Sequence, residues 1–549
     1  MDAATHRSVP IVGCLALVVL TFIFHHQALR SWWLSDDPQV LVHARTTTPL
    51  GVLFSPHAYR YLSSSSFTPL VTISFALDYA LAGMSPLFFY AHQLLALSVA
   101  ASLLFLLLAR AGQPLPAWLG SAVFLLAPPT VLVARGLMLR HYLEGLIFAL
   151  LALLLWDVAC RGKSPRRASA LVLGAATLYL AAMLAKEFYT PLPLLMLAIA
   201  YARRSPWRST VNRIAPSALA ALLYLLWRWS MLGSGGGYGD SVSLPAIAVL
   251  PLKIFHAVRG ALPIVPAALI AAASLVIAIV AVWRIGRAAI VFISTGFVFV
   301  FLPLVALATS FEQRYAFVGF TFFVAALTLA IQWMRARFVS TAFLFVVASF
   351  AAFIGWKEHQ KLEFNSRAII AEGQYVWTSS KNVLPLLASS PGWYLAGLNE
   401  LRRLDGRGDG PSFVLSIDAV VLGVASDVMH SLWGTSQIVP VGNKLTADVT
   451  RLRALKDSTL PLSFRLEKRQ NELSWNVTPV GSWFEFVSVP YYGKFSLPAQ
   501  GRRRLPEARE RQFFRVRREA EGGRWTVSPV MEMPRGDGVV TWSSGKAEN

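Results

Sequence analysis

Residues 142–160 read YLEGLIFALLALLLWDVAC, and residues 161–167 directly after them read RGKSPRR. The first stretch is long and apolar enough for a helix that crosses the hydrocarbon core of a bilayer, which takes roughly 20 residues. The second stretch gathers four Lys and Arg residues, which is typical of a loop on the cytoplasmic side of a membrane. Together they predict a transmembrane helix that ends in the cytoplasm.

Composition extends this prediction to most of the chain. Of its 549 residues, 55% are hydrophobic and 14% are charged, whereas a soluble domain has about 25% charged residues. Residues 1–356 hold 24 Lys and Arg but nine Asp and Glu, and residues 357–549 hold the other 26 basic and 20 acidic residues. These numbers exclude a wholly water-soluble enzyme. They predict a transmembrane domain at 1–356 and a polar, extracytoplasmic domain at 357–549.

The length criterion predicts eleven transmembrane helices. The first of them lacks a small-residue cleavage site, so we expect a retained span and not a removed signal peptide. The segment 188–202 is short and contains Pro191 and Pro193, which makes it the weakest candidate. The predicted spans are 9–29, 84–109, 117–134, 142–160, 168–185, 188–202, 214–231, 263–283, 288–307, 316–333 and 338–356.

The positions of the basic residues predict how these spans are oriented in the membrane. With a cytoplasmic N-terminus, 14 of the 24 basic residues of 1–356 fall in cytoplasmic loops, including every dense cluster, as the positive-inside rule expects. Eleven spans then place the C-terminal domain outside. Although the net charge is +21, much of it belongs to these topology-setting loops, so we predict membrane lipids and not nucleic acid as a partner.

The same topology places most of the scarce acidic residues on the outer face. A long outer loop at 30–83 contains Asp36 and Asp37 immediately after the first predicted helix. Adjacent carboxylates near a membrane can bind a divalent cation, or one of them can serve as a base. A plainer alternative is that outer loops simply need polar residues. The outer acidic residues are Asp36, Asp37, Asp78, Glu144, Glu187, Asp240 and Glu312.

Basic and aromatic side chains accompany these carboxylates. Arginine binds phosphate through two parallel hydrogen bonds and lysine adds a point charge, so the outer face suits a phosphate-bearing substrate and an acid–base step. A local ion pair between Lys186 and Glu187, and arginines that extend to lipid headgroups, are the alternatives. The candidates are Arg60, Arg135, Arg140, His141, Lys186, Arg314 and Tyr315.

Four sequence blocks in this order resemble the GT-C superfamily of glycosyltransferases that use polyprenyl-phosphate sugars, among them protein O-mannosyltransferases and bacterial proteins like the lipid A aminoarabinose transferases. They follow the DD pair, and the resemblance covers about residues 9–356. Pro128–Pro129 stands where a His-Pro is common in the family, and Gln93 where an Asn is common. The blocks are YRYLSSSSFTPLVTISFALDYALAGMSPLFFYAHQLLAL (59–97), APPTVLVARGLMLR (127–140), LAAMLAKEFYTPLPLLML (180–197) and SFEQRYAFVGF (310–320).

The resemblance implies an inverting glycosyl transfer on the outer face of a bacterial inner membrane. Asp36 or Asp37 would deprotonate the acceptor hydroxyl, with or without Mg²⁺ or Mn²⁺ and without an organic cofactor. Its acceptor would be a protein, lipid A or an envelope glycan. The donor phosphate would be held by Arg60, Arg135, Arg140, Lys186 and Arg314, with His141, Glu187, Glu312 and Tyr315 in support.

The C-terminal region contains short runs typical of strands. Short β-like runs at 412–424, 484–492 and 523–533 predict a mixed α/β or mostly β domain.

Other functions are also open. A transporter or flippase for lipid-linked glycans would carry charges along a path through the bilayer and would contain internal repeats. Here Arg228 is the main charge within a predicted span. A polysaccharide polymerase or ligase, or an assembly scaffold without chemistry, also stays open.

Overall fold

The computed structural model falls into two compact units. The helical unit comprises Met1–Ser31 and His43–Leu362, and the mixed unit comprises Trp32–Val42 and Glu363–Asn549. The structure describes residues 3–63, 66–162, 164–233, 313–333, 337–380, 383, 386–387, 390–411, 413–414, 429–432, 434–440, 461–469, 472–478, 483–488, 494–496, 500–504, 513–519, 525–529, 531–534 and 536–544.

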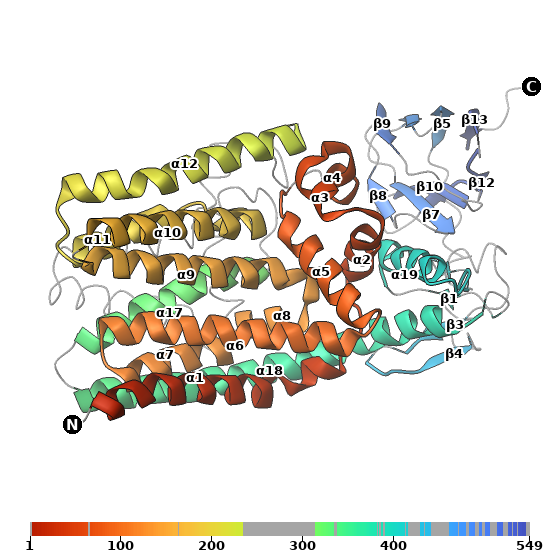
Figure 1. Cartoon of the computed structure of the whole chain (residues 1–549). Coiled ribbons are helices and arrows are strands. Elements are labelled where there is room, and N and C mark those ends of the chain that lie inside the picture. The colour runs from red at the N-terminus through yellow and green to blue at the C-terminus, as the bar shows by residue number, and fades with distance from the viewer. Residues whose placement is uncertain are drawn as a thin grey trace, which may run out of the picture. The chain divides into compact units, whose positions relative to one another are not determined.

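The helical unit is a bundle of apolar helices (Figure 1). Helix α10 packs against both α9 and α12, and α6 packs against α1, α7 and α9. Helices α2 and α18 continue into the mixed unit. The helices are α1 (Ala3–His25), η1 (His26–Arg30), α2 (Asp37–Thr46), α3 (Pro49–Phe54), α4 (Pro56–Leu62), α5 (Pro69–Ala82), α6 (Pro86–Ala111), α7 (Pro114–Leu126), α8 (Pro128–Arg135), η2 (Leu137–Leu139), α9 (Arg140–Arg161), α10 (Pro165–Ala185), η3 (Glu187–Tyr189), α11 (Leu192–Ala202), α12 (Trp207–Leu232), η4 (Gln313–Tyr315), α17 (Ala316–Trp333) and α18 (Arg337–Thr378).

Six described helices are long and apolar enough to cross a membrane, and a bent pair raises the number to seven. A multi-pass membrane protein is therefore confirmed, but the predicted count of eleven is not. The predicted spans 188–202 and 316–333 correspond to shorter apolar helices, and those at 263–283 and 288–307 lie outside the described residues. The six helices are Pro10–Arg30, Pro86–Ala111, Leu137–Arg161, Pro165–Ala185, Trp207–Leu232 and Thr341–Thr378.

The span predicted at 117–134 is broken. Helix α7 ends at Leu126, α8 begins at Pro128, and the two are bent by 58°. Pro128 and Pro129 lack the backbone N–H that would continue the hydrogen-bond ladder, and their rings clash with the preceding turn. The break therefore follows from the same Pro-Pro pair that departs from the resembled family.

Glycines allow close helix packing in this unit. A Cβ on Gly145 of α9 would lie 2.2 Å from the ring of Tyr189, and one on Gly355 of α18 would lie 1.9 Å from the carbonyl oxygen of Leu126. Small residues at such crossings are common in membrane proteins, where close packing replaces the hydrophobic effect between helices. Gly145 thereby brings α9 against η3, which positions the site described below.

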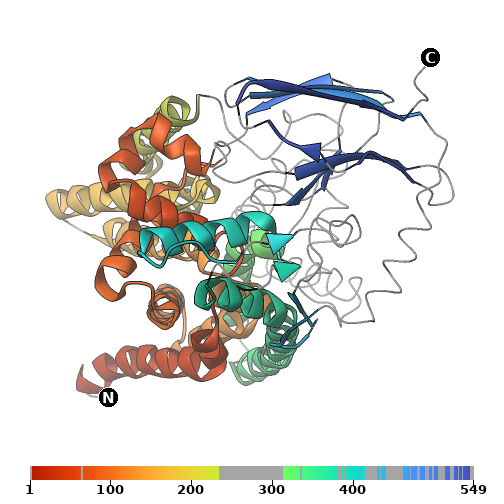
Figure 2. The ribbon, with the colours of Figure 1, turned by 90° about the vertical axis from the view of Figure 1, so that its right-hand side faces the viewer.

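The mixed unit contains α19 (Gly392–Leu404) and strands in three sheets, ordered β2-β1-β3-β4, β11-β10-β7-β8 with β12 on β10, and β13-β5-β6-β9. The second and third sheets stack face to face (Figure 2), and Phe464, Leu466 and Phe514 lie in their shared apolar core. The strands predicted for the C-terminal region are thus observed. The strands are β1 (Leu386–Leu387), β2 (Phe413–Val414), β3 (Met429–Ser431), β4 (Ile438–Pro440), β5 (Ser463–Arg469), β6 (Glu472–Thr478), β7 (Trp483–Ser488), β8 (Lys494–Ser496), β9 (Gln500–Arg504), β10 (Phe513–Glu519), β11 (Trp525–Val527), β12 (Met531–Glu532) and β13 (Gly538–Ser543).

Candidate active site

The two adjacent aspartates have different environments. Asp37 is 1% exposed, and its Oδ2 accepts a hydrogen bond of 2.8 Å from the backbone N–H of Leu34, while its own N–H donates to the Leu34 carbonyl at 3.0 Å. This reciprocal pairing fixes the turn that starts α2. Asp36 is half-buried, and its Oδ1 accepts a hydrogen bond of 3.0 Å from Trp393 Nε1. The surroundings therefore give Asp37 a structural partner and leave Asp36 the more accessible carboxylate.

The described residues do not complete a metal site around the pair. Within the described part of the chain, no group of three or more His, Cys, Asp or Glu side chains could hold a metal ion. One oxygen of each aspartate is already engaged, by Trp393 in one case and by Leu34 in the other. A divalent cation prefers six or more oxygen ligands, so no step below uses a metal.

A separate cluster in the helical unit surrounds Lys186. This lysine follows the C-terminus of α10, is 1% exposed, and its Nζ lies 3.4 Å from Glu187 Oε1. Its Nζ also lies 5.2 Å from the ring centroid of Tyr142 and 5.3 Å from that of Phe188. An ammonium between two aromatic faces is held by cation–π attraction. The block at 180–197 thus places a buried cation between aromatic rings.

Two further cationic or ionisable groups belong to this cluster. Lys186 and Arg314 are both close enough to His141 to act on it electrostatically. His141 lies in the first turn of α9 and is 8% exposed, and the Arg314 guanidinium lies 5.3 Å from the ring centroid of Tyr315. The rings of Phe188 and Tyr315 are 5.9 Å apart. Three sequence segments therefore meet in one positively charged cluster.

One carboxylate lies beside the cations of this cluster. Glu187 pairs with Lys186, and its Oε2 is buried with no hydrogen-bond partner in the described ranges. Lys186 and Arg314 would both attract an anion such as a phosphate, and electrostatic interactions of this kind are strong where water is excluded. Glu312, the predicted partner of Arg314, lies outside the described residues.

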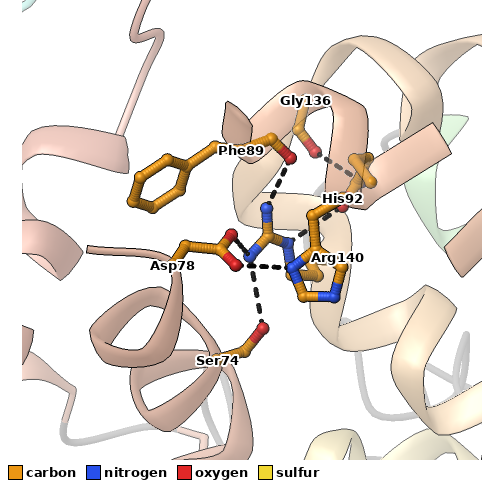
Figure 3. A network of polar contacts seen from close by, with 7 residues as sticks. Ser74, Asp78, Phe89, His92, Gly136 and Arg140 are labelled. Atoms are coloured by element: carbon orange, nitrogen blue, oxygen red, sulfur yellow. Dashed lines mark hydrogen bonds and ion pairs between the residues drawn. The ribbon is translucent and has the colours of Figure 1, made fainter. Parts of the chain in front are cut away.

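Arg140 belongs to a different network, which Figure 3 shows. Its Nη1 lies 2.5 Å from Asp78 Oδ2, its Nη2 donates to the carbonyl of Phe89 at 2.8 Å, and its Nε donates to Gln93 Oε1 at 3.1 Å. Asp78 Oδ1 is 2.6 Å from His92 Nδ1. Arg140 is fully buried, and all three guanidinium nitrogens have protein partners.

The other predicted arginines also contact protein groups. Arg60 Nε donates to the carbonyl of Met231 at 2.8 Å, at the C-terminal end of α12, where a cation interacts favourably with the helix dipole. Arg135 is 5% exposed, and its Nη1 donates to Gln27 Oε1 at 3.4 Å. The structure therefore brings together Lys186, Glu187, His141, Arg314 and Tyr315, and gives Arg60, Arg135 and Arg140 separate partners.

Two residues near these groups were not among the candidates from sequence. Trp393 contacts Asp36 across 357 positions of the chain, and no motif around it signals this. Arg228 is 9% exposed and acts on the hydroxyl of Tyr224, which also feels the charge of Glu187. Because α12 extends to Leu232, Arg228 lies in its last turns and not in mid-span. The predicted span 214–231 ends one residue before α12 does, so its bounds already placed Arg228 near a helix end.

Comparison with known proteins finds weak similarity to two solved structures. The sequence matches no protein-family model and no curated protein. The two solved structures are of one protein, ArnT. They are two crystal structures of ArnT from Cupriavidus metallidurans, one bound to undecaprenyl phosphate (TM-score 0.43, 11% identity) and one in the apo state (TM-score 0.36, 13% identity), each covering 80% of this chain and 98% of the other. The function proposed below rests on this chain's own residues, since both TM-scores are under 0.5.

Proposed function

We propose that this protein is a membrane glycosyltransferase that moves a sugar from a polyprenyl-phosphate carrier to an acceptor hydroxyl. The observation that carries the proposal is the cluster of the buried Lys186 and His141 with the half-buried Arg314 against aromatic rings. This cluster combines charge for a phosphate with apolar surface for the attached chain. Lys186 comes from the block at 180–197 and Arg314 from the block at 310–320, and both blocks resemble those of glycosyltransferases with such donors.

The cluster would bind the donor phosphate and stabilise the leaving group. When the bond between the sugar and the phosphate breaks, negative charge builds up on the phosphate oxygen. Lys186 and Arg314 are already in place, so they need no reorganisation as that charge develops. Glu187, 3.4 Å from Lys186, holds the ammonium in position. Phe188 and Tyr142 shield it from water.

The transfer itself needs one base. We assign this role to Asp36, because Asp37 caps the turn before α2. The acceptor hydroxyl gives its proton to Asp36, and its oxygen forms a bond to the anomeric carbon from the face opposite the phosphate. The bond from that carbon to the phosphate oxygen breaks, and polyprenyl phosphate leaves with the electron pair. Inversion follows from this single displacement.

The acceptor and the cellular location follow the predicted topology. The reaction would take place on the outer face of a bacterial inner membrane, with a protein, lipid A or an envelope glycan as acceptor. A transport function receives less support, because Arg228 lies in the last turns of α12 and so does not mark a path through the middle of the bilayer.

Donor turnover tests the proposal. The purified protein in nanodiscs is incubated with a panel of radiolabelled undecaprenyl-phosphate sugars and an envelope extract, and release of undecaprenyl phosphate is followed. We expect release with one donor, loss of release in Asp36→Asn, and weakened donor binding in Lys186→Met. Failure of folded wild-type protein to bind or turn over any donor would refute the proposal. Binding with movement of intact donor across the bilayer would favour a flippase.

A further inference from the structure

Helix α19 contacts the segment that carries the aspartate pair. Trp393, in its first turn, donates from Nε1 to Asp36 Oδ1 at 3.0 Å, and the two residues are 357 positions apart. Both belong to the mixed unit. The contact therefore links the outer-loop carboxylate to the C-terminal part of the chain, for which the sequence offered no role.

Three further contacts hold α19 against this segment. Tyr394 is fully buried, and its hydroxyl donates to the carbonyl of Trp33 at 2.9 Å. Gln39 Nε2 donates to the carbonyl of Trp393 at 3.4 Å. Gly397 lies so close to Pro38 that a Cβ at this position would be 2.9 Å from the proline Cβ. The position of Trp393 relative to Asp36 is therefore fixed by neighbours on both sides.

The contact leaves one oxygen of Asp36 available. Trp393 donates to Oδ1, and the described part of the chain shows no hydrogen bond or ion pair to Oδ2. Ser35, directly before Asp36, has φ of +49°, a left-handed conformation that costs a residue other than glycine roughly 1–2 kcal/mol. Strained backbone of this kind persists where the surroundings hold it, and it is common at functional sites.

Packing alone does not explain Trp393. Its side chain is 37% exposed, so much of the ring gains little from burial. Its N–H, by contrast, is directed at the carboxylate. Tyr394, the next residue, is the one that provides buried contact area. Tyr394 thus packs α19 against the aspartate segment, and Trp393 contacts the carboxylate of Asp36.

We propose that Trp393 is a positioning residue for Asp36, so that the C-terminal part of the chain completes the catalytic base. The inference rests on the proposed function, in which Asp36 accepts the acceptor proton. With Oδ1 held by the indole N–H, the carboxylate is fixed about its Cβ–Cγ bond and Oδ2 receives that proton. Correct orientation of a base contributes directly to the rate.

The first test is Trp393→Phe, which keeps an aromatic ring and removes the N–H donor. With an undecaprenyl-phosphate sugar that the wild type turns over, we expect kcat to fall about tenfold to a hundredfold, the range for losing one hydrogen bond to a charged group, with the donor KM unchanged. Trp542→Phe, the same change on β13, is the matched control and should leave kcat unchanged. Thermal unfolding of each variant checks that folding is intact.

A second test asks whether Trp393 orients a carboxylate or only supports the folded structure. Asp36→Ala removes the base, and sodium formate can then enter the vacated space and act in its place. If the Trp393 N–H orients a carboxylate there, formate restores turnover in Asp36→Ala but not in Asp36→Ala/Trp393→Phe. Equal rescue of both variants, or wild-type kcat in Trp393→Phe, overturns the inference and leaves the proposed function standing. A wild type that turns over no donor overturns both.

Discussion

Arg140 and Asp78 form a buried ion pair in which Nη1 and Oδ2 are 2.5 Å apart and neither side chain is more than 2% exposed. Arg140 begins α9, and Asp78 lies near the end of α5. Since the guanidinium also contacts Phe89 and Gln93 of α6, this pair joins three helices of the helical unit. A residue predicted to hold the donor phosphate is thus surrounded by protein partners, which suggests a role in the scaffold around the site.

Replacing Arg140 with Met should therefore destabilise the protein. Removing one partner of a buried pair leaves Asp78 uncompensated, and such changes cost about 3–5 kcal/mol. We expect a lower unfolding temperature in detergent, partly restored by adding Asp78→Asn. If Arg140→Met unfolds like the wild type but fails to bind an undecaprenyl-phosphate sugar, Arg140 contacts the donor.

Replacing Lys186 with Met should mainly change donor binding. Glu187 loses the cation 3.4 Å away but is itself 19% exposed, so the loss of folding stability should be smaller than for Arg140→Met. Binding of the donor phosphate, however, loses a charge-assisted contact, and we expect the donor KM to rise by about 10-fold to 100-fold. Donor titrations with Lys186→Met and with the exposed control Lys357→Met give the comparison. An unchanged KM in Lys186→Met would exclude the cluster as the phosphate site.

Replacement of the two aspartates should have different effects on turnover and on stability. Asp36→Asn should lower kcat by about 100-fold to 10,000-fold, the usual contribution of a general base, at unchanged stability. Asp37→Asn weakens the cap on Leu34 and should reduce the free energy of unfolding by about 1 kcal/mol while retaining turnover. Paired kinetic and thermal-unfolding measurements decide this. Full activity in Asp36→Asn with loss in Asp37→Asn would reverse the assignment.

Asp157 should act as a structural anchor away from the proposed chemistry. Its carboxylate is 2% exposed and lies 3.0 Å from Arg110 Nε, 3.1 Å from Arg161 Nη2 and 2.8 Å from Arg203 Nε. Asp157→Asn removes the charge that joins the ends of α6 and α9 to the residue after α11. We expect a loss of about 1–3 kcal/mol in stability and normal turnover per folded molecule. A large loss of turnover at wild-type stability would contradict this.

The sequence predicted some elements better than others, for local reasons. The span at 142–160 is a continuous apolar run, and the structure has it within α9. The span at 117–134 looked equally apolar, but its Pro128–Pro129 pair bends the chain by 58°. The mean hydropathy of a segment does not register such a pair. The helix is nevertheless interrupted there, because each proline removes a backbone hydrogen-bond donor.

The sequence also predicted some residues of the site better than others. Lys186, Glu187 and Arg314 were identified from their residue types and order, and the structure gathers Lys186 and Arg314 around His141. Arg140 has the same chemistry and was predicted to do the same work. Its contacts with Asp78 and Gln93 could not be foreseen, since they depend on how three helices are packed.

By itself, the sequence determined that the chain is a multi-pass membrane protein with a polar, strand-containing C-terminal region, because apolar length and charge density are properties of continuous segments. Only the tertiary structure distinguished Asp36 from its neighbour Asp37 and paired it with Trp393. The physical reason is that the environment of a carboxylate is set by the groups that surround it in space. Here one of those groups comes from a helix 357 positions further along the chain.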